Sequence, residues 1–481
     1  MTGVLVRRLL AMVIAGVLLG LTYGLEPWWP AAWLAPIPLL LAAFAAPPRV
    51  AWWLGCGAGL IGGLAMVTYY AVVTTPVIAV VLTLLLALSW GVVVSLARRA
   101  VVNSTHWMQV FAYPVLWAAH DTLLAAISPH GSAGSLAYSQ MNGLPVIQVA
   151  SLAGTPGIVF VVSLFGSIVA VSVYRRRHGR PAHVTLPLLV LLITLGYGVV
   201  RLALAETTAT LPVGLAALDV PPDATRGLGE PLWDVYARTV ETLATRGARI
   251  VVLPEKIEVA DAAASPALQR RLGQLAARHG VHLVVGITVL ADGRKENRAW
   301  LFASTGALAV DYLKQHLIPG LEGAFTPGRE DAVHRLGTDS LGVAICKDFD
   351  FPALGRRYAA KGAEVALVPS WDFARDAWQH GRMAMLRGVE SGFTVVRAAR
   401  NGLLTVSDRY GRVLAETPSL GDRVALLVGQ APLGGRPTLY ARFGDVFGWS
   451  CVLLALGVWV VALRPDRRAT RAPRVEPKSS G

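Results

Sequence analysis

Long apolar runs separated by short polar loops fill the first 204 residues, and a different pattern follows them. A helix needs about 20 apolar residues to cross a bilayer. Runs of suitable length lie at 8–24, 30–46, 52–73, 76–97, 107–127, 145–173 and 185–204, with one more at 445–463. The pattern predicts about eight membrane-spanning helices, seven before residues 205–444 and one after them. Asp121 interrupts the fifth run, which is the least regular of the set.

Residues 205–444 alternate short apolar stretches with amphipathic ones. We predict strands at 212–219, 249–254, 281–289, 298–303, 308–312, 341–345, 364–368, 394–398 and 403–407, and helices at 231–247, 265–279, 353–362 and 377–391. Such alternation is typical of a layered α/β domain whose sheets are covered by helices. The chain therefore divides into a transmembrane domain (1–204), an α/β domain (205–444), a last transmembrane helix (445–463) and a basic tail (464–481) that we expect to be disordered.

Basic residues indicate how the chain is oriented in the membrane. The net charge of +14 comes largely from clusters in alternate loops and in the tail. These clusters are Arg7 and Arg8, Arg49, Arg98 and Arg99, Arg175 to Arg180, and the residues after Arg464. Because lysine and arginine are retained on the cytoplasmic side, we predict that residues 205–444 lie outside the cytoplasm. The charge therefore gives no reason to expect a nucleic-acid partner.

Three predicted strands of the α/β domain end in residues that can do chemistry together. Glu255 follows an apolar strand, Lys314 follows a second, and Cys346 follows a third. A carboxylate can take the proton of a thiol, the thiolate can attack a carbonyl, and an ammonium can stabilise the resulting oxyanion. Alone, each residue has an ordinary explanation, such as a solvated carboxylate or a buried cysteine. The cysteine and histidine spacing contains no zinc pattern, so we expect no metal and no other cofactor.

The order, spacing and surroundings of Glu255, Lys314 and Cys346 resemble the catalytic triad of the nitrilase superfamily of carbon-nitrogen hydrolases. With the apolar runs included, the whole chain resembles the apolipoprotein N-acyltransferase family. Further similar segments are 136–140, 148–154, 383–392 and 397–402. Glu322 stands where the family carries a second glutamate, and Asp348 stands where it carries another. The resemblance gives both of them supporting catalytic roles.

The resemblance implies an α-β-β-α sandwich on the outer face of a bacterial inner membrane. It also implies a two-step acyl transfer. Cys346 would take a fatty acyl chain from a phospholipid as a thioester, and the N-terminal amine of a lipoprotein's diacylglyceryl-cysteine would then accept the chain. The partners would be a phospholipid donor, a diacylated lipoprotein acceptor and the bilayer itself, and we expect the protein to be a monomer.

The chain departs from the family pattern beside the nucleophile. Lys347 replaces an aromatic residue, and Lys256 follows Glu255 where a small residue is usual. We expect the charge of Lys347 to lower the pKa of Cys346 or to contact an anionic lipid headgroup. Candidates for substrate contact are Lys347, Trp371, Phe325 and Glu390.

Two alternatives to acyl transfer remain open. A membrane-anchored amidase of the same superfamily would use water to release the acyl group, although eight spans are an odd requirement for a soluble substrate. A non-catalytic envelope scaffold would need no triad, and the presence of Glu255, Lys314 and Cys346 argues against it.

Overall fold

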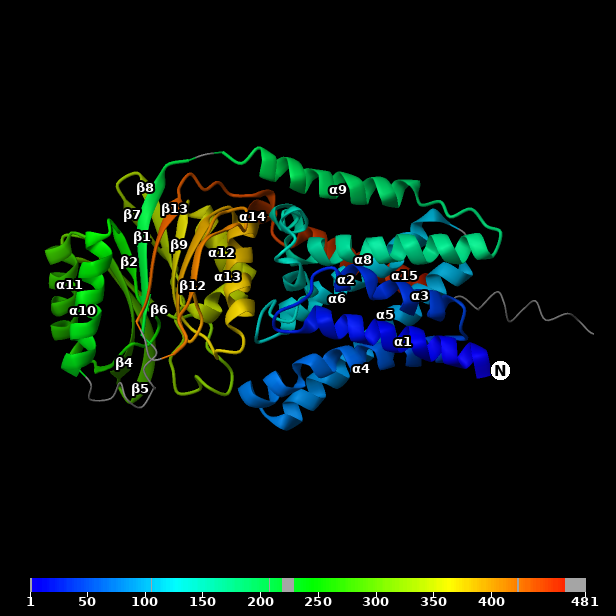
Figure 1. The fold of residues 1–481 in the computed structure, drawn as a ribbon, viewed down its shortest axis with the longest axis horizontal. Coiled ribbons are helices and arrows are strands. Elements are labelled where there is room, and N and C mark those ends of the chain that lie inside the picture. Colours follow the sequence, from blue (N-terminus) through cyan, green and yellow to red (C-terminus); the bar gives the residue numbers. More distant parts are fainter. Residues whose placement is uncertain (1, 105, 207, 219–228, 422–423, 463–481) are drawn as a thin grey trace, which may run out of the picture.

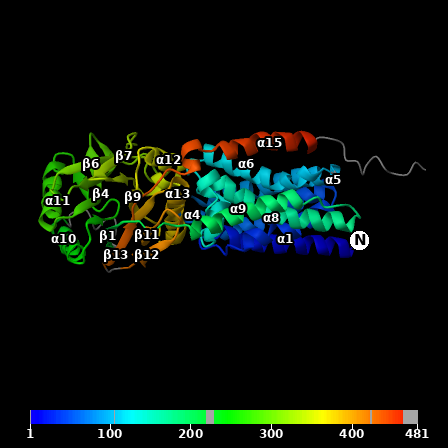
Figure 2. The same cartoon turned by 90° about the horizontal axis from the view of Figure 1, so that it is seen from above.

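A bundle of apolar helices and an α/β domain lie end to end in the computed structural model (Figure 1, Figure 2). The structure describes residues 2–104, 106–206, 208–218, 229–421 and 424–462. The basic tail at 464–481, for which we predicted disorder, lies outside these residues.

The helical part consists of α1 to α9 and of α15, which follows the α/β domain. The bounds are α1 Thr2–Tyr23, α2 Ala31–Leu34, α3 Pro36–Phe44, α4 Pro48–Val73, α5 Pro76–Asn103, η1 Trp107–Phe111, α6 Ala112–Ile127, η2 Leu136–Gln140, α7 Leu144–Ile147, α8 Ala150–Arg177, α9 Thr185–Ala203 and α15 Val446–Ala462. Among the described residues, six helical segments are long and apolar enough to cross a membrane, and Ala31–Phe44 and Val446–Val460 are shorter apolar helices. The polytopic helical part is confirmed, whereas the number of eight spans stays a prediction.

Proline and glycine determine where several of these helices begin or bend. Pro48 and Pro76 occupy first turns, where proline costs no hydrogen bond, and the side chain of Thr75 accepts from the Ile78 amide. The run predicted at 145–173 corresponds to α8, which is long and apolar enough to cross a membrane, but α7 ends before it at Ile147 and α8 bends at Gly154, whose φ is 65°. A Cβ on Gly154 would lie 2.5 Å from the Tyr440 ring, so only glycine permits this approach.

The α/β domain contains two sheets. The strands are β1 Thr210–Ala217, β2 Ile250–Val252, β3 Val259–Asp261, β4 His282–Ala291, β5 Arg294–Phe302, β6 Leu308–Leu313, β7 Ala332–Leu336, β8 Asp339–Val343, β9 Val365–Trp371, β10 Thr394–Arg400, β11 Leu403–Ser407, β12 Val413–Pro418 and β13 Ala425–Pro432. One sheet has the order β13-β1-β2-β4-β5-β6, with β3 paired to β4, and the other has the order β12-β11-β10-β9-β8-β7. Parallel pairs form the centre of each sheet, and antiparallel pairs lie toward the edges.

Helices cover the outer face of each sheet. A buried apolar cluster fills the space between the two sheets. A second cluster joins the first sheet to α10 (Gly229–Thr245) and α11 (Ser265–His279), and a third joins the second sheet to α12 (Pro352–Ala360) and α13 (Ala377–Ser391). The four layers confirm the predicted α-β-β-α sandwich (Figure 1).

The α13 layer also attaches the sandwich to the helical bundle. Met383, Met385, Leu386 and Val389 of α13 belong to the same buried cluster as residues of α8. Views from two directions place α12 and α13 beside the bundle (Figure 1, Figure 2). After α13 and the last strands, the short helix α14 (Leu439–Phe443) leads into α15. The ends of the strands in the second sheet are thereby held close to the membrane helices.

Candidate functional site

Glu255, Lys314 and Cys346 come together where strands of the two sheets end. Glu255 lies three residues beyond β2, and its amide donates to the Ser370 carbonyl of β9, 3.3 Å away in the other sheet. Lys314 directly follows β6, and its Nζ donates to Glu255 Oε1 at 2.9 Å. Cys346 begins the short helix η4 (Cys346–Asp350) after β8. The site therefore forms across the interface between the sheets.

A buried cluster of two carboxylates and two ammonium groups surrounds this point. Lys314 Nζ also donates to Glu322 Oε2 at 3.0 Å, and Lys256 Nζ donates to Glu322 Oε1 at 2.7 Å. Asn297, from the middle of β5, donates to Glu255 at 2.6 Å and to Glu322 at 3.1 Å. The charges in the cluster balance, and each carboxylate has more than one donor, as buried charges require.

The electrostatic surroundings determine the protonation of the cluster. Burial disfavours the ammonium of Lys314, but Glu255 and Glu322 outweigh that effect and raise its pKa. Burial likewise disfavours the carboxylate of Glu322, but Lys314 and Lys256 outweigh it and lower the pKa to about 2. The raised pKa favours the charged form of Lys314, the form that could stabilise an oxyanion.

The thiol of Cys346 is held in its protonated form. Burial, followed by the charge of Glu255, raises the pKa of Cys346, while Lys314 and Arg397 act in the opposite direction. The pKa of Cys346 is thus raised overall, and the expected influence of Lys347 on it stays a prediction. Because the resting thiol keeps its proton, attack on a carbonyl requires a base, and Glu255 is the carboxylate whose charge acts most strongly on the thiol.

Asp348 connects the turn at Cys346 to the loop that carries Lys314. Cys346 has a φ of 43°, which is uncommon for a residue other than glycine. Asp348 accepts from the Ile345 amide at 3.1 Å, which closes this turn, and from the Tyr312 hydroxyl at 2.8 Å. It also accepts from the His316 amide at 2.8 Å, on the other side of Lys314. These bonds make Asp348 a positioning residue between the nucleophile and the ammonium.

Aromatic rings and a buried ion pair border the thiol. The Cys346 thiol donates to the Trp371 carbonyl at 3.6 Å. Lys256 Nζ lies 5.3 Å from the centres of both the Phe325 and the Trp371 rings, so it connects the two aromatic residues that we predicted to contact substrate. Behind them, Arg397 donates to both oxygens of Asp372, at 2.9 and 2.5 Å.

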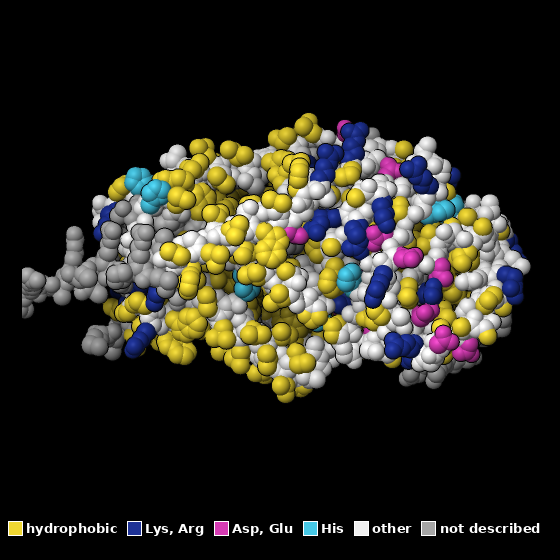
Figure 3. Space-filling model, turned by 180° about the vertical axis from the view of Figure 1, so that it is seen from behind, with side chains coloured by type: hydrophobic (Ala, Val, Ile, Leu, Met, Phe, Trp, Pro, Cys, Tyr) yellow, Lys and Arg dark blue, Asp and Glu magenta, His cyan; other side chains and the backbone are white. Residues whose placement is uncertain are grey.

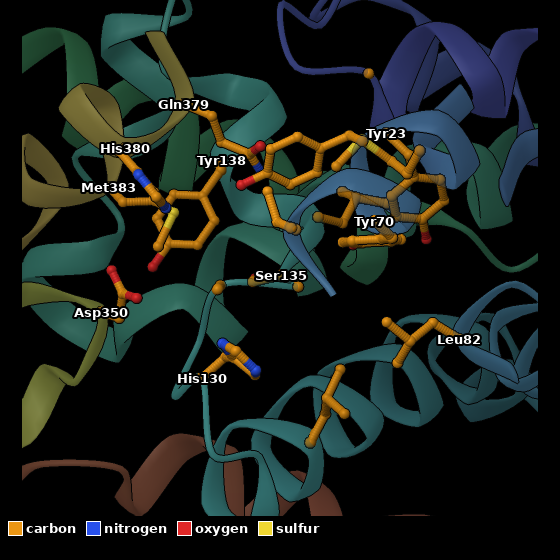
Figure 4. Close-up of a pocket in the computed structure, with 18 of the residues that line it drawn as sticks. Tyr23, Tyr70, Leu82, His130, Ser135, Tyr138, Asp350, Gln379, His380 and Met383 are labelled. Carbon is orange, nitrogen blue, oxygen red and sulfur yellow. The ribbon is translucent and has the colours of Figure 1, made fainter. Parts of the chain in front are cut away.

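A cavity of about 310 Å³ opens onto Cys346 and extends between the membrane helices. Its lining includes Tyr23 of α1, Tyr70 of α4 and Leu82 of α5, which lie on one side in Figure 4, and His130, Asp350 and His380 on the opposite side. Most of the lining is apolar. The outer surface shows the same division, with hydrophobic side chains over the helical part and charged ones over the α/β domain (Figure 3).

Two other predicted contact residues occupy different surroundings. Lys347 lines the cavity, and its Nζ contacts His130 Nδ1 at 3.1 Å and Asp350 Oδ2 at 3.2 Å. Glu390 is fully buried, does not line the cavity, and pairs with Arg387 at 3.1 Å. Arg387 in turn donates to the Tyr138 hydroxyl at 2.9 Å, so this pair lies between the α/β domain and the helical bundle.

Several residues of the site gave no signal in the sequence. Asn297 lies in β5, which begins at Arg294 although we predicted it to begin at 298, and His130 lies in a loop of the membrane part. His380 approaches Asp372 and Asp376, which raise its pKa to about 9 against the opposing effect of burial. Isolated polar residues of this kind can be assigned to the site only once the fold shows which residues they contact.

Comparisons with known proteins divide the chain in the same way. The family described as carbon-nitrogen hydrolase matches residues 216–427, and the family described as apolipoprotein N-acyltransferase N-terminal domain matches residues 15–168. The apolipoprotein N-acyltransferase of Geobacter metallireducens is 29% identical over 507 aligned positions, covering 95% of this chain and 96% of the relative. That of Gloeobacter violaceus is 26% identical and covers 97% and 96%. A solved amidase from Nesterenkonia sp. is 25% identical, covers 48% of this chain and 93% of its own, and has a TM-score of 0.39.

Proposed function

The chain belongs to the apolipoprotein N-acyltransferase family, and from that premise we propose that it moves a fatty acyl chain from a membrane phospholipid to a lipoprotein. The donor is a phospholipid ester, the carrier is a thioester on Cys346, and the acceptor is the N-terminal amine of a diacylglyceryl-cysteine. The reaction takes place at the outer face of the bacterial inner membrane.

The observation that carries this proposal is the cavity that joins the thiol to the membrane helices. A soluble amide substrate needs no apolar passage between α1, α4 and α5, whereas a fatty acyl chain does. Its volume of about 310 Å³ falls at the lower end of the range for small-molecule pockets. The cavity therefore supports a lipid substrate over the soluble substrate of an amidase.

The first half of the reaction forms the thioester. Glu255 takes the proton of Cys346 as the sulfur attacks the ester carbonyl, and the ammonium of Lys314 stabilises the oxyanion that develops. When the tetrahedral intermediate collapses, the carbon–oxygen bond breaks, and the protonated Glu255 returns a proton to the departing alkoxide. The products are an acyl-enzyme and a lysophospholipid.

The second half transfers the acyl group to the amine. The neutral N-terminal amine attacks the thioester, Glu255 takes the proton that the nitrogen loses, and the oxyanion again lies beside Lys314. Collapse expels the sulfur, which regains its proton from Glu255. The amide product leaves, and the free thiol is restored.

A transfer assay tests the proposal. The purified protein is incubated in detergent with a phospholipid bearing a deuterated acyl chain and with a diacylated lipopeptide, and the lipopeptide mass is then measured. We expect the wild type to add the deuterated chain, and we expect Cys346→Ala and Glu255→Gln to add none. Deuterated free fatty acid with an unmodified lipopeptide would indicate hydrolysis by water and would contradict acyl transfer.

A further inference from the structure

Polar groups gather on the side of the cavity where the thiol lies. Lys347 immediately follows Cys346, and its ammonium is buried, with 5% of the side chain exposed. Its two neighbours are Asp350 of the same turn and His130 of the segment between α6 and η2 (Figure 4). All three residues line the cavity. A cation thus lies beside the nucleophile, at the boundary between the two parts of the molecule.

The position of this group is fixed from both parts. The Asp350 carbonyl accepts from the Ser132 amide at 3.1 Å and from its hydroxyl at 2.9 Å. Ser132 lies two residues beyond His130, so the loop of the membrane part is hydrogen-bonded to the turn of the nucleophile. Lys347 also lies 5.6 Å from the centre of the Phe351 ring. The ammonium is therefore held at one place by contacts that do not depend on a ligand.

The hydrogen-bonding capacity of this group is not exhausted. An ammonium has three protons, and in the described part of the chain Lys347 Nζ has two acceptors, His130 Nδ1 and Asp350 Oδ2. An imidazole that accepts at Nδ1 and is neutral carries its own proton on Nε2. One N–H of the ammonium and the Nε2–H of the imidazole are thus left for a ligand. Both groups are hydrogen-bond donors, which is what an anionic ligand requires.

We propose that Lys347 and His130 bind the phosphodiester of the acyl donor. This inference rests on the proposed function and adds the residues that bind the phosphate of the donor. In a glycerophospholipid, the phosphate and the two acyl esters are attached to the three carbons of one glycerol, so every ester lies within two carbons of the phosphate-bearing carbon. Binding the phosphate at residue 347 therefore brings an ester carbonyl to residue 346. Asp350 balances the ammonium while the site is empty, so that no buried charge is left unpaired.

The test compares two donors that differ only in the phosphate. Acylation of Cys346 is followed by intact mass in detergent, with phosphatidylglycerol or with a neutral diacylglycerol of the same acyl chains. We expect Lys347→Met to lower kcat/KM for phosphatidylglycerol by about 30-fold, the size expected for losing one partner of a buried charge pair. The same variant should lower the slower reaction with diacylglycerol far less, and Lys347→Arg should retain most of the phospholipid rate.

Matched variants separate this role from a structural one. Lys361→Met removes a half-exposed lysine that pairs with Asp331 at the end of α12, and it should alter neither rate. His130→Phe should lower the rate with phosphatidylglycerol more than the rate with diacylglycerol. Equal losses with both donors in Lys347→Met, or no loss with either, would overturn the phosphodiester site. A folded wild type that neither donor acylates would instead overturn the proposed function.

Discussion

At the scale of single residues, the site depends on a balanced set of buried charges. Glu255 and Glu322 carry two negative charges, and Lys314 and Lys256 carry two positive ones, with Asn297 bridging the carboxylates. Such a set keeps Lys314 charged, because the two carboxylates raise its pKa against the effect of burial. Removing one member leaves another uncompensated in a buried place, which is costly.

Glu322→Gln tests this balance. The change leaves Lys314 and Lys256 with one carboxylate between them, so we expect a loss of about 3 kcal/mol and a fall of about 6 °C in the melting temperature. Acylation of Cys346 should slow at least about tenfold, because Lys314 loses the partner that fixes its position. Tryptophan fluorescence on heating and intact mass measure the two effects.

The double variant Lys256→Met/Glu322→Gln is the control for charge balance. It removes one charge of each sign, so it should melt at a higher temperature than Glu322→Gln alone. A double variant that is as unstable as the sum of the two single changes would contradict the account, because independent sites add and coupled charges do not.

His380 gives the protein a predictable pH dependence. Its Nδ1 lies 3.2 Å from Asp376 and 3.4 Å from Asp372. Burial opposes its charge, but the aspartates raise its pKa from 6.5 to about 9. A raised pKa stabilises the folded protein fully below pH 6.5, and this contribution is lost as the pH rises through about 9. The melting temperature should fall over that interval, and in His380→Gln it should fall less. Identical pH profiles would show that His380 contributes nothing.

The sequence predicted the reactive residues better than their partners. Glu255, Lys314 and Cys346 each follow an apolar strand, and strand ends in layered α/β domains are where reactive groups gather. The structure brings these residues together, although their catalytic roles stay a prediction. The contact between Lys347 and His130 could not be predicted, because His130 belongs to a membrane loop more than 200 positions earlier in the chain.

At the scale of elements, the position of Glu255 depends on how closely β4 passes it. Gly286 of β4 donates from its amide to the Pro254 carbonyl at 3.1 Å, and its carbonyl accepts from the Ile257 amide at 2.9 Å. A Cβ on Gly286 would lie 2.5 Å from both the Glu255 Cα and the Pro254 oxygen. Glycine is therefore required for β4 to hold the segment that carries Glu255.

Gly286→Ala should both displace Glu255 and lower the stability of the α/β domain. We expect a loss of about 2 kcal/mol, as for other overpacked cores, and acylation of Cys346 slowed at least about tenfold. Gly323→Ala is the matched control, because a Cβ there meets nothing within 4 Å although it lies beside Glu322. If both variants acylate like the wild type, the close approach of β4 does not position the base.

Helices and strands whose hydrophobic residues recur with a clear period were predicted well, and elements without such a period were missed. The helices at 265–279 and 377–391 were predicted to the residue, since each is amphipathic and is followed by a glycine with positive φ. The strands β12 and β13 were missed, because their residues are mostly half-buried and show no clean alternation. The run at 30–46 forms the shorter apolar helix Ala31–Phe44, in which only Ala35, with helical φ and ψ, separates α2 from α3.

At the scale of the whole molecule, the sandwich and the helical bundle form one functional unit. Residues of α13 pack into the core of the bundle, and Arg387 and Glu390 form a buried pair that contacts Tyr138. The cavity extends from the nucleophile of one part into the helices of the other. No sequence pattern could predict this interface. It depends on how the α/β domain packs against the helical bundle, and the pattern of each region describes only that region.

Orientation in the membrane is tested by labelling introduced cysteines. Cys56, Cys346 and Cys451 are buried, so they give little background. If the sandwich faces outward, as we predict, a membrane-impermeant maleimide added to spheroplasts should label Gln274→Cys, on the exposed face of α11. Arg177→Cys, at the end of α8, should be labelled only after permeabilisation. The reverse pattern would place the sandwich in the cytoplasm.

The acyl-enzyme tests the central claim most directly. The purified protein is incubated with phospholipid and its intact mass is measured, for the wild type and for Cys346→Ala, before and after a diacylated lipopeptide is added. We predict that the wild type alone gains the mass of one acyl chain and that the lipopeptide removes this mass while becoming triacylated. A folded wild type that gains no mass, or an adduct that persists in Cys346→Ala, would contradict the account.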